Sequence, residues 1–428
     1  MTSSGPNSRV VVVGGGLAGM AAAARLAKAG HSVELYESGD RLGGSWAPYE
    51  LEGVLIDDAP AVLNFPAPWR DLFRKSGRPL EAELARRKLA LEPAAAPSYQ
   101  FADGSDLVLP SERGEQYAAL SGAYGSAVAS RWRDLLDSLG PAWQAVRPLG
   151  LESELRDRRQ LAAAGRDLRP RVTIAELADQ LDEPHLGALV RSVAYRLGSV
   201  PEQTPAWCAV ELLVQRTFGR WVVAASDGGP PTGRTSVLVE VLADRLALRK
   251  VQVHLGRRVT RLEISDQRVQ GVTFENGTSA AASAVICTLD PWSTYSALGV
   301  PATWRTRRAV RRWQPARAPA VTHLLRPATS VGVRETWRLT ADGTPVVKAT
   351  RPTGSGTWET VHDYSRAEPR RSAGIAWTGF GSWLSRPRIR SEVGGLFLAG
   401  PSSAGGAAPS AVVLSGALAS YACQDYLG

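Results

Sequence analysis

The chain has 428 residues, of which 50 are basic and 41 acidic, so its net charge at neutral pH is +9. This length can bury a substantial core and allows two to three domains or one large composite domain. The three cysteines, Cys208, Cys287 and Cys423, form no Cys-x-x-Cys pair, which argues against a disulfide framework or a zinc site and favours a reduced, cytoplasmic setting.

The segment of residues 10–38, "VVVVGGGLAGMAAAARLAKAGHSVELYES", is apolar enough to resemble a secretion signal, but its glycines indicate another structure. A β-branched run ends in Gly14, Gly16 and Gly19, a helix-forming run follows, and a second strand pattern ends in Glu37. In such a unit the three glycines permit a tight turn, the close approach of a diphosphate and close helix packing, in that order. The diphosphate would lie on the helix N-terminus and Glu37 would bind a ribose hydroxyl, so the segment predicts a dinucleotide site.

Two later segments repeat this strand pattern. Residues 251–291 carry a hairpin signal, and residues 395–400, "GLFLAG", form a buried strand that leads into a Gly, Ser and Ala loop and an apolar helix. Outside residues 10–38, no run of about 18 apolar residues predicts a membrane-spanning helix. The intervening stretches are helical, arginine-rich or polar, which predicts a discontinuous two-domain architecture. The first domain is expected to comprise residues 1–97, 231–291 and 376–428, and the second residues 98–230 and 292–375.

Arginines cluster between Arg305 and Arg317, in "RTRRAVRRWQPAR". A solvated face is the simplest interpretation of such a run. Contact with anionic lipid headgroups is a second interpretation, because Trp304, Val310 and Trp313 interleave with the arginines. No nucleic-acid-binding motif accompanies the run, so we expect no nucleic-acid partner.

Four segments together resemble the flavoprotein amine oxidase and phytoene desaturase superfamily over nearly the whole chain. They are "VVVGGGLAG…ELYES", "DRLGGSW", "GRTSVLVEVLADRLALRKVQVHLGRRVTRLEISDQRVQGVTF" and "GLFLAGPSSAGGAAPSAVVLSGALAS". The resemblance implies an α/β fold, with a Rossmann-type, glutathione-reductase-like FAD-binding domain and a discontinuous α+β substrate domain. It also implies that the nucleotide is non-covalently bound FAD.

The resemblance implies which residues hold each part of FAD. The residues expected at the diphosphate are Gly14, Gly16, Leu17, Ala18, Gly19 and Arg41, with Glu37 at the adenosine ribose and the backbone of Val259 at the adenine. The residues expected to line the isoalloxazine are Gly43, Gly44, Ser45, Pro60, Ala61 and Val62. Those expected at the ribityl chain and the flavin pyrimidine are Gly400, Pro401, Ala411 and Val412.

Three positions depart from the family pattern. Ser45 stands where an arginine often follows the paired glycines, Pro401 replaces a residue with an N–H group, and Ala59 replaces a frequent glycine. The first two departures are expected to remove contacts to FAD and to weaken its binding, unless a neighbour such as Ser402 substitutes.

In this family the expected chemistry is hydride transfer from a substrate carbon to flavin N5, in which protein groups position the substrate and exclude water. The scattered histidines therefore need no catalytic role, and no catalytic residue is assigned. Trp377, Phe380 and Trp383 either wall the substrate pocket or pack beneath the sheet. Lys348 either mimics the water-holding lysine of amine oxidases or only alternates in a strand.

The favoured function is a desaturase-type oxidoreductase of a lipophilic, polycyclic or isoprenoid-like small molecule, with quinone or oxygen as electron acceptor. The protein would be cytoplasmic, with peripheral membrane contact as a further expectation. One alternative is an amine or amino-acid oxidase that releases hydrogen peroxide. A second is a flavin-binding isomerase or a non-catalytic FAD carrier. The sequence assigns no oligomeric state.

Overall fold

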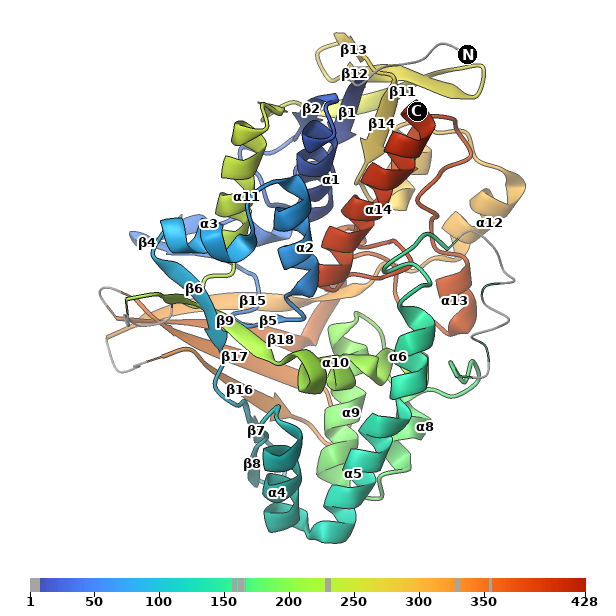
Figure 1. The fold of residues 1–428 in the computed structure, drawn as a ribbon. Coiled ribbons are helices and arrows are strands. Elements are labelled where there is room, and N and C mark those ends of the chain that lie inside the picture. The colour runs from blue at the N-terminus through green and yellow to red at the C-terminus, as the bar shows by residue number, and fades with distance from the viewer. Residues whose placement is uncertain are drawn as a thin grey trace.

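The computed structural model describes residues 8–155, 160, 165, 167–227, 232–327, 332–353 and 356–428. In Figure 1 a sheet with its covering helices occupies the upper part of the molecule, a helical body occupies the lower part, and long strands cross between them. The ends of the predicted domains at residues 230 and 231 fall outside the described residues, and the domain boundaries stay a prediction.

The upper body is built on a parallel sheet of five strands in the order β10-β2-β1-β14-β19. The strands are β1 (Arg9–Val13), β2 (Ser32–Tyr36), β10 (Gln252–His254), β14 (Ala284–Cys287) and β19 (Leu396–Leu398). They come from three distant parts of the sequence, as the repeated strand pattern predicts. All four residues of β14 are buried, which explains its continuous apolar sequence.

The two faces of this sheet are covered differently. Val10 and Val12 face a core formed with five helices, whereas Val11 and Val13 face a three-stranded antiparallel sheet. The helices are α1 (Leu17–Lys28), α2 (Ala67–Ser76), α3 (Leu80–Arg86), α11 (Val237–Leu248) and α14 (Pro409–Leu427). The three strands are β11 (Val259–Ser265), β12 (Arg268–Phe274) and β13 (Ser279–Ala281), and the antiparallel pairing of β12 with β13 confirms the hairpin predicted within residues 251–291.

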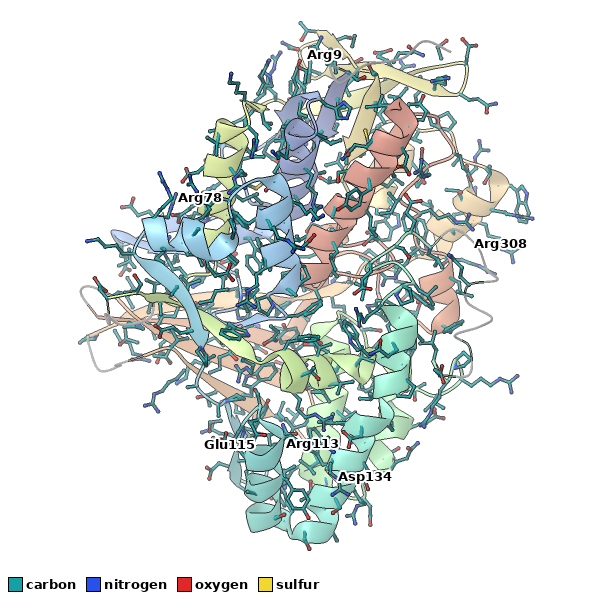
Figure 2. The ribbon with its side chains drawn as sticks, in the orientation of Figure 1. Arg9, Arg78, Arg113, Glu115, Asp134 and Arg308 are labelled. Carbon is teal, nitrogen blue, oxygen red and sulfur yellow. The ribbon has the colours of Figure 1, made fainter. Side chains whose placement is uncertain are left out.

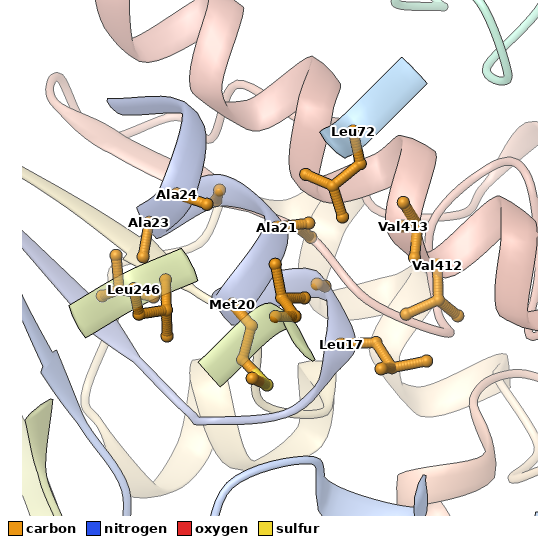
Figure 3. Close-up of a cluster of buried hydrophobic side chains, with 14 of the residues drawn as sticks. Leu17, Met20, Ala21, Ala23, Ala24, Leu72, Leu246, Val412 and Val413 are labelled. Atoms are coloured by element: carbon orange, nitrogen blue, oxygen red, sulfur yellow. The ribbon is translucent and has the colours of Figure 1, made fainter. Parts of the chain in front are cut away.

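Helix α1 lies at the centre of the helical layer. Figure 3 shows its side chains between Leu246 of α11 and Val412 and Val413 of α14. A Cβ atom at Gly416 of α14 would lie only 2.3 Å from the carbonyl oxygen of Ala18, so only glycine allows α14 to cross α1 this closely.

The lower body combines a mixed sheet with helices. The sheet has the order β15-β18-β17-β16-β7-β8, and its strands are β7 (Ser98–Gln100), β8 (Asp106–Val108), β15 (Arg317–Arg326), β16 (Arg334–Leu339), β17 (Pro345–Pro352) and β18 (Thr357–Pro369). The helices are α4 (Arg113–Tyr124), α5 (Ser126–Ser138), α6 (Gly140–Val146), α8 (Ile174–Asp179), α9 (Pro184–Arg196) and α10 (Val210–Phe218). Strand β16 pairs with β7 in parallel, so the two inserted segments meet in one sheet, as expected.

Short elements complete the fold. Strands β5 (Leu63–Asn64), β9 (Arg220–Ala225) and β6 (Leu89–Pro93) form a small antiparallel sheet, and β3 (Tyr49–Leu51) pairs with β4 (Val54–Ile56). The remaining helices in the described ranges are α12 (Trp304–Arg312), α13 (Phe380–Leu384) and the single turns Gly44–Trp46, Ala206–Ala209, Ser293–Ala297 and Arg371–Ala373. No helix in the described ranges is both long enough and apolar enough to cross a membrane.

Candidate cofactor site

Each glycine that follows β1 serves a different structural purpose. Gly14 has a φ of +101°, and a Cβ atom there would lie 2.3 Å from Thr288 Oγ1. A Cβ at Gly19 would lie 2.0 Å from the carbonyl oxygen of Gly14, so this glycine lets α1 pack against the turn. By contrast, a Cβ at Gly16 would meet no other protein atom within 4 Å, because it would project into open space. That open space is where a dinucleotide-binding loop must leave room for a diphosphate.

A second glycine loop lies against the first. The N–H of Gly43 donates to the carbonyl oxygen of Gly15 at 2.8 Å, and a Cβ at Gly44 would lie 3.3 Å from the Cα atom of Gly16. Arg41 precedes this loop, but its half-exposed guanidinium pairs with Asp40 at 3.0 Å. The loops therefore meet as the resemblance implies, while the contact of Arg41 with the phosphates stays a prediction.

The loop between β19 and α14 closes the same space from a third direction. Gly400 has a φ of +119°, and its N–H donates to Ser415 Oγ of α14 at 2.9 Å. The next residue is Pro401, which has no N–H group. Helix α14 begins after Ala408 without a side-chain cap, so the N–H groups of its first turn have no side-chain acceptor.

These three loops enclose a cavity of about 110 Å³, which we call the cofactor cavity. It is lined by Gly16, Leu17, Ala18, Gly43, Gly44, Ser45, Trp46, Thr288, Gly400, Pro401, Ala407, Pro409 and Val412. No acidic side chain lies in the first turn of α1 or α14, and neither helix has a side-chain cap. Two positive helix ends thus border one cavity whose lining contains no acidic side chain, which suits a diphosphate.

Glu37 lies at the end of β2 beside the glycine loop. Its Oε2 atom accepts from the N–H of Gly15 and its Oε1 atom from the N–H of Gly39, both at 2.7 Å. Each carboxylate oxygen has a second lone pair, so Glu37 can also accept from a ribose hydroxyl. The backbone of Arg257 donates to the carbonyl oxygen of Glu37 at 2.8 Å, which places the start of β11 close to Glu37, while the contact of Val259 with the adenine stays a prediction. The cradle thus fits both the diphosphate and the ribose of a dinucleotide.

Residues 57–62 lie beside the six-stranded sheet of the lower body rather than at the cofactor cavity. We call this sheet the substrate sheet. Ala61 and Val62 are buried in a small cluster with Val222 and Ala349, whereas Pro60 is exposed. Thr235 Oγ1 donates to the carbonyl oxygen of Pro60 at 2.9 Å. The expected contact of these residues with the isoalloxazine stays a prediction.

A buried arginine that the sequence did not indicate holds this loop. Arg351 of β17 is fully buried, and its guanidinium donates to the carbonyl oxygens of Ala59 and Gly233, each at 3.0 Å. It also donates to Thr360 Oγ1 at 2.6 Å and lies 4.1 Å from the centre of the Trp358 ring. One side chain of the substrate sheet therefore fixes two loops of the upper body.

Asp57 lies next to this guanidinium. Its Oδ2 atom accepts from the N–H of Ser236 at 2.9 Å, and its Oδ1 atom lies 3.9 Å from Nη2 of Arg351. Burial raises the pKa of Asp57, and the positive charge of Arg351 opposes that rise. Burial also lowers the pKa of Arg351 to about 10, which leaves the guanidinium charged at neutral pH.

Asp58 interacts with polar side chains of the β3–β4 hairpin and of the substrate sheet. Its Oδ1 atom lies 2.8 Å from the hydroxyl of Tyr49 and 2.8 Å from Nε2 of His323. Because Trp358 Nε1 donates to Nδ1 of His323 at 3.0 Å, the imidazole proton lies on Nε2 and donates to Asp58. The hydrogen bond from His323 lowers the pKa of Asp58, and burial raises the pKa of Tyr49. Sequence reasoning missed this network, because its members are far apart in the chain.

The three candidate wall aromatics lie in the helical core. Trp377 and Trp383 are 4 % and 1 % exposed, and each ring centroid is 5.1 Å from that of Trp207. Trp383 Nε1 donates to the carbonyl oxygen of Ala404 at 3.0 Å, and Phe380 packs on the Trp383 ring. The rings thus support the loop after β19 and do not line the cofactor cavity. This geometry favours the packing interpretation, and a role as substrate-pocket wall stays a prediction.

Lys348 lies on β17 with its side chain partly exposed. Its ammonium group is 3.7 Å from a carboxylate oxygen of Glu359, on the neighbouring strand β18. This ion pair is consistent with the interpretation of Lys348 as an alternating strand residue, and a role at the cofactor stays a prediction.

The glycine-rich cradle between two helix N-termini defines the class of the protein, which is a dinucleotide-binding flavoprotein with an inserted substrate domain. The family described as "Flavin containing amine oxidoreductase" matches residues 17–324. The chain belongs to this family, and its cofactor is non-covalently bound FAD.

The curated relatives include carotenoid enzymes. The chain is 28% identical over 327 residues to a zeta-carotene-forming phytoene desaturase of Myxococcus xanthus, which covers 73% of this chain and 59% of the relative. It is 26% identical over 321 residues to a 4,4'-diaponeurosporene oxygenase of Staphylococcus aureus, which covers 74% of this chain and 62% of the relative. The matched region thus spans about three fifths of the length of these relatives.

Solved structures with the same fold include amine oxidases. An engineered putrescine oxidase superposes with a TM-score of 0.69 and 16% identity, over 98% of this chain and 99% of the other. An oxidoreductase from Methanosarcina mazei gives a TM-score of 0.67 with 17% identity, over 96% and 99% of the two chains. At these identities the likeness establishes the fold, and it confirms the expected Rossmann-type FAD domain with an added substrate domain.

Proposed function

We propose that the protein is an FAD-dependent dehydrogenase of the desaturase type that acts on a lipophilic, isoprenoid-like small molecule. The observation that carries this proposal is the cofactor cavity, where two uncapped helix N-termini and a glycine with an open Cβ position leave room for a diphosphate. The carotenoid substrates named for the curated relatives support the lipophilic substrate class.

In this reaction FAD supplies the acceptor for a hydride equivalent at flavin N5. The chain binds the cofactor through the N-terminal N–H groups of α1 and α14 and through Glu37. Arg351 holds the loops around Ala59 and Gly233 against the substrate sheet, which fixes the position of the substrate-binding strands relative to the cofactor-binding body. Such fixed positioning is the main contribution that a protein makes to hydride transfer.

The electron acceptor and the cellular setting are part of the same proposal. Quinone or oxygen reoxidises the cofactor, and the protein works in the cytoplasm with peripheral contact to a membrane. The three cysteines are buried and free of disulfides, which supports a reducing compartment. A substrate that partitions into lipid supports the membrane contact.

Anaerobic flavin reduction tests this proposal. The FAD-loaded protein is mixed without oxygen with a detergent-solubilised isoprenoid such as phytoene, and separately with putrescine or cyclohexylamine. We expect the oxidised-flavin absorbance to be lost with the isoprenoid and retained with the amines. Reduction by an amine, followed by hydrogen peroxide release in air, would establish the amine oxidase alternative. Retention of oxidised flavin with both substrate classes would favour an isomerase or a non-catalytic carrier.

A further inference from the structure

Helix α12 concentrates positive charge on one exposed face. Its nine residues, "WRTRRAVRR", include five arginines. At about 100° per residue, Trp304 and all five arginines fall within an arc of about 160°. The residues of that arc are exposed, and they are Trp304, Arg305, Arg307, Arg308, Arg311 and Arg312. We call this set the arginine face. The other three residues, Thr306, Ala309 and Val310, are half-buried and form the side next to the protein.

The protein itself does not neutralise the arginine face. In the ranges that the structure describes, no acidic side chain forms an ion pair with any of the five arginines. Elsewhere in the chain some arginines do form ion pairs, such as Arg87 with Asp244. Arg308 projects from the edge of the molecule, away from the ribbon (Figure 2).

The helix is anchored at its N-terminus, which keeps the arginine face turned outward. Glu392 accepts from the backbone N–H of Thr303 at 2.7 Å and from the hydroxyl groups of Thr303 and Thr306 at 2.7 and 2.9 Å. At the other end, Trp313 is buried and its Nε1 donates to Ser385 Oγ at 3.2 Å. These contacts hold the two ends of the helix and use none of the five guanidinium groups, of which that of Arg305 lies 5.4 Å from the centre of the Trp304 ring.

Trp304 adds an apolar group to this cationic surface. Its side chain is 67 % exposed, more than that of any other large hydrophobic residue in the described part of the chain. Tryptophan with arginine is the composition that proteins place at the boundary between lipid headgroups and water. An acidic protein or a nucleic acid would satisfy the arginines but would not require an exposed indole beside them.

We propose that the arginine face docks the protein on a bilayer that contains anionic lipids, with Trp304 inserted at the headgroup level. This inference names the membrane-contacting surface of the proposed function, but it depends only on the charge and exposure of α12. Basic residues near an anionic leaflet contribute additively to attraction, and salt screens that attraction.

Sedimentation with vesicles tests the proposal on the full FAD-loaded chain. We expect binding to phosphatidylcholine vesicles that contain phosphatidylserine, little binding to pure phosphatidylcholine, and loss of binding at high salt. The double substitution Arg308→Glu with Arg311→Glu should lower the partition coefficient at least about tenfold. Trp304→Ala should lower it by a smaller factor.

A matched control separates the local surface from net charge. Arg334→Glu with Arg338→Glu makes the same charge change at two exposed positions of β16, and we expect it to retain most of the binding. An equal loss in both double variants, or binding of wild type to a nucleic-acid duplex but not to vesicles, would overturn the proposal. Flavin reduction by detergent-solubilised substrate should be unchanged by the α12 substitutions. Failure of that reduction in wild type, with vesicle binding intact, would reject the proposed chemistry and leave this inference standing.

Discussion

Single residues at the cofactor site serve the loop and the ligand together, and Glu37 is the clearest case. Its carboxylate holds the N–H groups of Gly15 and Gly39, so it orders the glycine loop before any ribose is bound. Glu37→Ala should therefore weaken FAD binding by roughly 1.5 to 3 kcal/mol, the range for hydrogen bonds to charged groups. Glu37→Gln should lie between Glu37→Ala and wild type. Fluorescence titration with FAD measures the change. A Glu37→Ala variant whose FAD affinity matched that of wild type would mean that Glu37 is only a charge at the end of a strand.

Residues defined by local pattern could be predicted, and residues defined by long-range contact could not. Gly14, Gly16 and Gly19 follow a strand at fixed spacing, so their roles can be read from the sequence. Arg351 and Thr288 carry no local signature. Thr288 Oγ1 donates to the carbonyl oxygen of Val13, a residue 275 positions away in the chain. Only the position of Thr288 immediately after the buried "AVIC" strand could have indicated that it lies at the cofactor edge.

At the scale of elements, strand β17 connects the two bodies through one buried side chain. Arg351→Met should destabilise the protein by about 3 to 5 kcal/mol, because it leaves Asp57 buried without a counter-charge and leaves two carbonyl oxygens without donors. It should also weaken FAD binding, since the loops that it releases belong to the cofactor-binding body. Denaturant unfolding and FAD titration measure the two effects.

Arg338→Met is the control for that variant. It makes the same substitution at an exposed position of the adjacent strand β16, where we expect a stability change within about 0.5 kcal/mol. If Arg351→Met unfolded at the same denaturant concentration as wild type, the connection between the bodies would reside elsewhere.

The order of elements was more predictable than the partners of each element. The strand patterns at residues 10–38, 251–291 and 395–400 form one parallel sheet, because buried parallel strands have a continuous apolar sequence. The small sheet of β5, β9 and β6 was not predicted, because β5 has only two residues and its pairing with β9 joins segments more than 150 residues apart. The surroundings of the aromatic group at α13 could not be predicted either, because a run of hydrophobic residues is equally compatible with a protein core and with the wall of a pocket.

At the scale of the whole molecule, FAD is expected to occupy the space between the N-termini of α1 and α14. Because a ligand that binds only the folded state stabilises it, FAD at one hundred times its dissociation constant should raise the free energy of unfolding by about 2.7 kcal/mol. Gly16 offers a selective test, because its φ of −74° and ψ of 178° suit any residue and its Cβ position is open. A Gly16→Val variant should therefore fold normally and yet fill the space that the diphosphate needs.

The most direct measurement is thermal unfolding of wild type and Gly16→Val with increasing FAD, monitored together with flavin absorbance. We predict equal melting temperatures without FAD, a rise with FAD for wild type alone, and release of intact FAD when wild type is denatured. A colourless wild-type protein that gains no flavin absorbance after incubation with FAD, or a Gly16→Val variant that FAD stabilises as much as wild type, would contradict the account.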